Sequence, residues 1–219
     1  MEDLAAHSQY VELVAALIGL IMYKHYKGTQ LVYFLILLWY VTINEFFAGI
    51  SYPVFGIPNY IPYNIYYGIN FVFFLWWYRS LISWKNGKKA LLFFMLIFLT
   101  GYLVDSMFLN DIVYRYLTYA FTAGTVLLIL CVAIYFMDRL YRDAVFNITA
   151  SPYFWISFGV LFYCVAYLPF LVAYRFMESN YGEIRSVVLF IVNVIQYCCF
   201  AVAFIKGRQA KEEYPAVYD

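Results

Sequence analysis

Three acidic side chains fall inside long apolar stretches of this sequence, where an ionised group is costly and is usually functional. They are Glu12, Glu45 and Asp105. Glu45 follows Asn44, and the stretch around it, residues 30–50, contains no Lys or Arg. Its carboxyl group must therefore be protonated, hydrated in a cavity or paired with another part of the chain. A carboxyl group so placed is suited to binding a proton, a cation or a polar ligand.

Carboxamide and phenol groups accompany these acids in other apolar stretches. Tyr67 and Asn70 are three residues apart and share one face of an expected helix, as do Asn193 and Gln196. Asn70 is expected at the depth of Glu45. The alternative is that the carboxamides only hydrogen-bond between helices, each contributing about 0.6 kcal/mol. The candidate ligand-binding or relay residues are Glu45, Asn44, Tyr67, Asn70, Asp105, Asn193 and Gln196.

A separate charged group comprises Asp138, Arg139, Arg142 and Asp143. Opposite charges stand four residues apart in it, which suits a helix. These charges either pair with one another in solvent or form a surface on which a cytoplasmic protein docks.

The composition requires lipid around the chain. Of 219 residues, 66% are hydrophobic and 12% are charged, against about 25% charged residues in soluble domains. A membrane-spanning helix needs about 20 mostly apolar residues. Seven stretches qualify, so we expect one all-α, polytopic bundle of seven transmembrane helices spanning residues 1–219. The stretches are residues 11–26, 30–50, 62–84, 90–109, 112–137, 152–177 and 184–205.

The basic residues predict the orientation of these spans, because Lys and Arg mark cytoplasmic loops. Of the 14 Lys and Arg residues, all but Arg115, Arg175 and Arg185 fall in one set of alternate loops and tails. The N-terminus is therefore expected outside and the C-terminus in the cytoplasm. Glu12 is expected at the interface, and Asp105 either reaches the interface or joins Glu45.

The sequence lacks the motifs that several classes of enzyme and binding protein require. No His-Glu-x-x-His, Gly-x-Ser-x-Gly or P-loop pattern occurs. His7 and His25 are expected on opposite sides of the membrane, and the four cysteines lack zinc-ligand spacing. The net charge of +1 offers no basic surface for nucleic acid. We therefore predict no catalytic residue, no metal and no nucleic-acid partner.

Seven helices with an outside N-terminus is also the topology of microbial rhodopsins and G-protein-coupled receptors. A retinal pigment needs a lysine in the middle of its last helix. The stretch at 184–205 has none, and Lys206 follows at its end. No retinal or other cofactor is therefore expected.

Short motifs carry a resemblance to one group of membrane proteins. They are Asn44-Glu45, the run 63–66 (Tyr-Asn-Ile-Tyr), the run 152–157 (Pro-Tyr-Phe-Trp-Ile-Ser), and Asn193 with Tyr197. The chain resembles an uncharacterised group of small bacterial seven-helix integral membrane proteins, which are similar to membrane sensor modules of histidine kinases. The resemblance implies signalling by association and a place in the bacterial inner membrane, and it transfers no site residue.

Three functions remain open at this stage. The leading one is a receptor-like sensor that binds a small ligand or a proton in an outer-half cavity walled by aromatic residues and signals to a separate cytoplasmic partner. The alternative is a small transporter or channel that uses Glu45 and Asp105 as a cation or proton relay. The third is a membrane enzyme acting on lipid, for which no nucleophile and base can be named.

Overall fold

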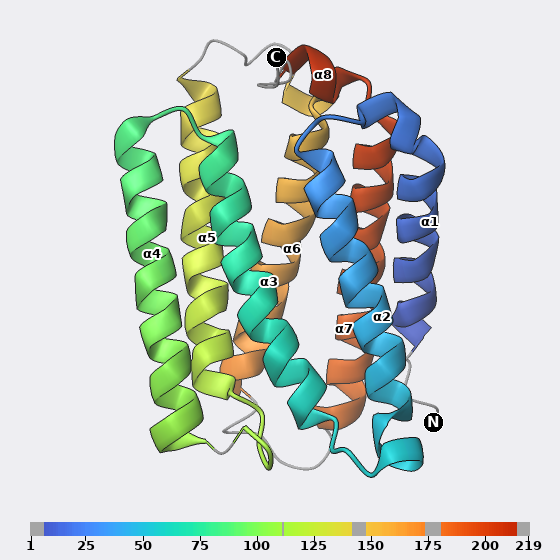
Figure 1. The fold of residues 1–219 in the computed structure, drawn as a ribbon, viewed down its shortest axis with the longest axis vertical. Coiled ribbons are helices and arrows are strands. Elements are labelled where there is room, and N and C mark those ends of the chain that lie inside the picture. Colours follow the sequence, from blue (N-terminus) through green and yellow to red (C-terminus); the bar gives the residue numbers. More distant parts are fainter. Residues whose placement is uncertain (1–6, 111, 142–147, 174–180, 214–219) are drawn as a thin grey trace. The chain divides into compact units, whose positions relative to one another are not determined.

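The computed structural model describes residues 7–110, 112–141, 148–173 and 181–213 (Figure 1). These residues form helices and no strand, which confirms the all-α class. The elements are α1 (Ser8–Tyr26), α2 (Leu31–Phe55), α3 (Tyr60–Leu81), α4 (Lys85–Val104), the π-helical turn η2 (Asp105–Leu109), α5 (Thr118–Leu140), α6 (Pro152–Ala173), α7 (Tyr181–Ile205) and α8 (Gln209–Glu213).

Five helices in the described part of the chain are long and apolar enough to cross a membrane, so a membrane location is plausible. They are Leu31–Phe55, Lys85–Leu109, Thr118–Leu140, Pro152–Pro169 and Ser186–Ile205. Helices α1 and α3 fall outside this group by composition rather than by length. Helix α1 contains Glu12, Lys24 and His25, and α3 contains five tyrosines and Arg79.

Glycine and proline set several of the helix boundaries. Gly28 and Gly56 follow α1 and α2 with φ of 86° and 67°, a conformation that glycine adopts without steric cost. Pro62 lies in the first turn of α3 and Pro152 opens α6, positions where the missing amide hydrogen costs nothing. These residues therefore separate helices that the apolar composition alone would run together.

The chain divides into two compact units, and the division falls within α2. Unit 1 comprises residues 1–42 and 146–219, and unit 2 comprises residues 43–145. In unit 1, α7 packs against both α1 and α6. Helix α1 approaches its neighbours closely at Gly19, where a β-carbon would lie 2.6 Å from Leu35 and 3.0 Å from Phe204. Any larger residue at position 19 would therefore require the Leu35 or Phe204 side chain to shift.

Unit 2 consists of the end of α2 with α3, α4 and α5, and the last three lie side by side (Figure 1). Phe71 on α3 fills their centre. Its ring lies 5.2 Å from that of Phe98 and 5.5 Å from that of Phe121. A β-carbon added at Gly124 would lie 2.7 Å from the Phe71 ring. The core of unit 2 is thus an aromatic cluster, and the absence of a side chain at Gly124 leaves room for its central ring.

Candidate functional site

Glu45 lies near the end of α2 and is paired with a tyrosine of α3. The Tyr63 hydroxyl donates a hydrogen bond of 2.8 Å to the Glu45 carboxylate. Both side chains are half-buried. The ring of Tyr63 lies 6.2 Å from that of Tyr116, which in turn lies 5.1 Å from Tyr60. Glu45 is therefore linked through Tyr63 to the rings of Tyr116 and Tyr60 in unit 2.

Asn44 adds an amide group to the same turn of α2. Its Nδ2 atom is buried and has no hydrogen-bond partner among the described residues. A buried polar atom without a partner costs about 1–3 kcal/mol. The turn thus carries a carboxylate and an unsatisfied donor in adjacent residues, whose side chains leave the helix in different directions.

Asn64, the neighbour of Tyr63, was not among the predicted site residues. Its side chain is completely buried. Its amide nitrogen donates to the carbonyls of Ile112 and Arg115 at 2.9 and 2.8 Å. Its amide oxygen accepts from the backbone of Leu117 at 3.0 Å. Asn64 therefore fixes the segment 112–117 to α3, and its place in a Tyr-Asn pair within an apolar stretch was the available signal.

Asp105 is only 1% exposed, and its partners are structural groups. Its carboxylate accepts a bond of 2.7 Å from the backbone of Ala120 and one of 2.6 Å from the Asn110 side chain. Ala120 lies in the first turn of α5, whose N-cap residue Leu117 supplies no side-chain cap. Asp105 thus caps α5 from a neighbouring element, and its part in a relay with Glu45 stays a prediction.

The remaining predicted residues are spread over both units. Tyr67 is half-buried on α3, with its ring 4.5 Å from that of Phe121. Asn70 is half-buried on the same helix. Asn193 and Gln196 are half-buried on α7 and belong to unit 1. Among the hydrogen bonds described for the predicted site residues and their neighbours, the one that reaches Glu45 comes from Tyr63.

Unit 1 has its own carboxylate–tyrosine pair. The Tyr197 hydroxyl on α7 donates to Glu12 on α1 at 2.8 Å. Glu12 is 2% exposed, so its carboxylate is buried among helices, while its expected depth at the membrane interface stays a prediction. The small residues Ala15, Ala16 and Gly19 on the same helix are also buried. Glu12 thus belongs to the buried, small-residue face of α1.

Two residues of the expected docking surface are buried instead of solvated. Asp138 and Arg139 are 4% and 7% exposed. The Asp138 carboxylate accepts from the backbone of Trp84 at 2.9 Å and of Ser83 at 3.2 Å. The guanidinium of Arg139 lies 5.6 Å from the centre of the Tyr135 ring. Asp138 therefore caps α4, whose own N-cap residue Trp84 has no side-chain cap.

The other two residues of that surface, Arg142 and Asp143, lie outside the described residues.

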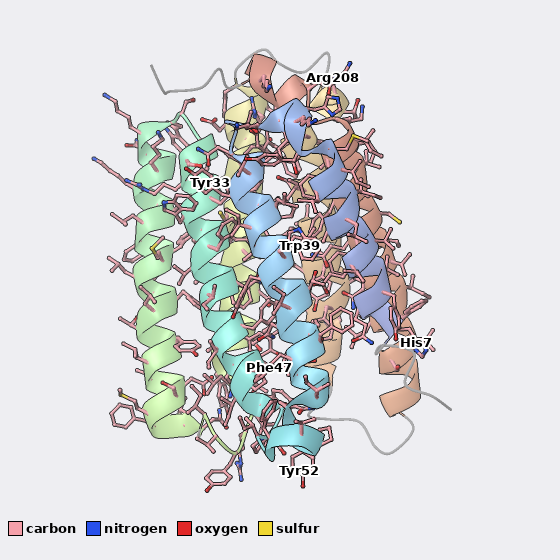
Figure 2. The ribbon with its side chains drawn as sticks, turned by 45° about the vertical axis from the view of Figure 1, so that its right-hand side comes forward. His7, Tyr33, Trp39, Phe47, Tyr52 and Arg208 are labelled. Carbon is pink, nitrogen blue, oxygen red and sulfur yellow. The ribbon has the colours of Figure 1, made fainter. Side chains whose placement is uncertain are left out.

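His7 and Arg208 lie at opposite ends of the unit 1 helices (Figure 2). Arg208 lies 3.2 Å from the His25 ring, so the two histidines occupy opposite ends of α1. Within the described ranges, no three His, Cys, Asp or Glu side chains are grouped to hold a metal ion.

No family model, no curated protein and no solved structure matches this chain. The described side chains therefore supply the basis for inferring a function.

Proposed function

We propose that the chain crosses a bacterial inner membrane seven times, with its N-terminus outside and its C-terminus in the cytoplasm. Helices α1 and α3 contain 19 and 22 residues. At 1.5 Å per residue they reach about 28–33 Å, close to the thickness of the hydrocarbon core. Their tyrosines lower their hydropathy, but tyrosine is well suited to membrane interfaces and to buried hydrogen bonds. The loop bias of Lys and Arg supports the orientation.

Within this topology the chain serves as a receptor-like sensor, with the Glu45–Tyr63 pair as the sensed element. The observation that carries this proposal is the half-buried Glu45 carboxylate, bound by one phenol at 2.8 Å beside the unsatisfied amide of Asn44. A proton or a small polar molecule that competes for the carboxylate would release the Tyr63 hydroxyl. The fixed roles of Asp105 and Asp138 favour this function over a relay built on Asp105.

A chain of contacts within unit 2 leads from Glu45 toward the opposite end of α5. Tyr63 adjoins Asn64, which holds the segment 112–117 that precedes α5. Helix α5 then runs to Asp138, which caps α4. A shift of Tyr63 would therefore act on the start of α5 and change the contacts at its other end. A separate cytoplasmic protein would read that change, because coupling needs an element that both sites can bias.

Protons are the probe for a direct test. Amide hydrogen exchange of the purified full chain in lipid nanodiscs would be followed by mass spectrometry at acid and alkaline pH, with correction for intrinsic exchange. We expect the segments 112–120 and 83–89 to change protection with pH in the wild type. Glu45→Gln should abolish that change, because a carboxamide cannot titrate. Glu12→Gln is the matched control and should leave it intact.

The same variants separate the two main functions. Equal behaviour of Glu45→Gln and wild type in hydrogen exchange would contradict proton sensing at this site. Proton flux through liposomes that contain the chain, abolished by Glu45→Gln, would identify a transporter instead.

A further inference from the structure

The first turns of α4 carry three lysines and no acidic residue. Lys85, Lys88 and Lys89 lie at spacings of three and four, which places them on one side of the helix. Lys85 and Lys89 are exposed. The start of a helix carries partial positive charge, so acidic side chains are favoured there and basic ones are not. Three lysines at this end are therefore electrostatically unfavourable unless an anion compensates them.

The Asp138 carboxylate lies at the same end of α4 and binds its backbone. Asp138 is 4% exposed and is directed at the backbone of Ser83 and Trp84. Its charge is used to cap the helix, and the amides that it binds are closed to other anions. The exposed ammonium groups of Lys85 and Lys89 thus remain accessible to an anion from outside the protein.

An apolar stripe continues from the lysines along the same helix. Leu92, Phe93 and Leu96 are 47%, 61% and 56% exposed. The opposite side of α4 packs through Gly87, Leu91 and Phe98, which are buried. Within unit 2, α4 thus presents a basic end and an apolar length on one outward face.

Trp84 stands at the junction of the basic and apolar parts. Its ring lies 3.1 Å from the position that a β-carbon at Gly87 would take, so the first turn of α4 holds the indole in place. The indole is 48% exposed. Exposed tryptophan is enriched where the headgroup and acyl regions of a bilayer meet. Trp84 therefore marks the depth at which lipid phosphates would lie.

We propose that this surface, defined by Trp84, Lys85, Lys88, Lys89 and the stripe Leu92–Leu96, binds the headgroup of an anionic phospholipid. The lysines contact its phosphate groups, and its acyl chains lie along the stripe. Basic residues next to a spanning helix attract anionic lipid by about 1 kcal/mol each. The leaflet concerned, but not the binding itself, depends on the orientation proposed above.

Lipid binding to the purified full chain tests the proposal. Native mass spectrometry in detergent would compare phosphatidylglycerol with phosphatidylcholine as added lipids. We expect the wild type to prefer phosphatidylglycerol, and the triple variant Lys85→Gln, Lys88→Gln, Lys89→Gln to lose affinity for it by roughly tenfold or more. Glutamine keeps the helix propensity of lysine, so the variant should remain folded, which circular dichroism would verify.

The matched control removes the same charge from unit 1. Lys24, Lys27 and Lys211 are also exposed, but they are divided between the end of α1 and α8, so their replacement by glutamine should lower phosphatidylglycerol affinity clearly less than the α4 variant does. An equal loss in both triple variants, or no loss in either, would overturn the proposal. Displacement of the lipid by excess inorganic phosphate would show a free-anion site and would overturn the lipid assignment. These results do not involve Glu45, so they can fail independently of the sensor proposal.

Discussion

Four acidic side chains of this protein are bound in two different ways. Two are aspartates at the ends of α4 and α5, and two are glutamates paired with tyrosines. At the ends of α4 and α5, Asp105 and Asp138 accept hydrogen bonds from backbone amides of the neighbouring helix. Each helix carries, near its C-terminal end, the aspartate that caps the start of the other. Glu12 and Glu45 instead accept from tyrosine hydroxyls, each at 2.8 Å.

The difference separates structural acids from adjustable ones. A backbone amide in the first turn of a helix cannot leave its acceptor unless the helix start unwinds. A phenol can rotate away about its side-chain bonds while both helices stay intact. The aspartates are therefore suited to holding the helix pair together, and the glutamates are suited to responding to a proton or a ligand.

The largest expected effect is that of Asp105→Ala. The change removes the acceptor of two hydrogen bonds at a residue that is 1% exposed. We expect the free energy of unfolding to fall by about 3 kcal/mol, measured by denaturant unfolding in detergent micelles. Ser106→Ala is the control, because that hydroxyl donates only within its own turn, to Leu103. A loss for Asp105→Ala no larger than that of the control would remove the distinction between the two classes of acid.

Asp138→Ala should have the next largest effect, about 2 kcal/mol, since it uncaps α4. The same unfolding measurement applies. Asp105 and Asp138 act at opposite ends of α4, so their losses should add to within about 0.5 kcal/mol in the double variant. A double variant whose loss of unfolding free energy differs strongly from the sum would mean that the two caps are energetically coupled.

The sequence predicted the helices far better than these caps. Helices α2 and α7, at Leu31–Phe55 and Tyr181–Ile205, match the stretches 30–50 and 184–205. The stretch 112–137 was expected to be helical from its start, but α5 begins at Thr118. Apolar composition could not show this, because the segment before Thr118 is held by Asn64, 48 residues from Ile112 along the chain.

The site was predicted in part for the same physical reason. Burying a carboxylate is costly wherever it occurs, so composition alone singled out Glu45 and Asp105. Their different partners, Tyr63 and the backbone of Ala120, depend on which helices pack together. Burial of Glu12 likewise depends on the packing of α1 against α7, which brings Tyr197 to its carboxylate and which hydropathy does not encode.

The two glutamate–tyrosine bonds should each contribute less than either cap. Double-mutant cycles with Glu→Gln and Tyr→Phe would measure the coupling of Glu45 with Tyr63 and of Glu12 with Tyr197. We expect about 1 kcal/mol of coupling in each cycle, the typical value of one hydrogen bond. A coupling above the Asp138→Ala loss in either cycle would place that glutamate among the structural acids.

The smallest effect on stability is expected from Asn44→Leu. The buried Nδ2 atom of Asn44 has no partner among the described residues, so an apolar side chain of similar size should be nearly neutral. The free energy of unfolding should change by less than about 0.5 kcal/mol. The pH dependence of amide hydrogen exchange in segment 112–120 should weaken. A loss of more than about 1 kcal/mol would show that Asn44 is a structural residue.

The division of the chain has a consequence for the order of synthesis. Unit 2 is one continuous run, residues 43–145, whereas unit 1 joins the beginning of the chain to its end. The bond between Glu12 and Tyr197 closes a separation of 185 residues. The reciprocal caps of α4 and α5 can therefore form on the nascent chain before α6 and α7 leave the ribosome. Helix α1 cannot bury Glu12 against Tyr197 until α7 has been translated, so late steps of biogenesis decide when Glu12 is buried.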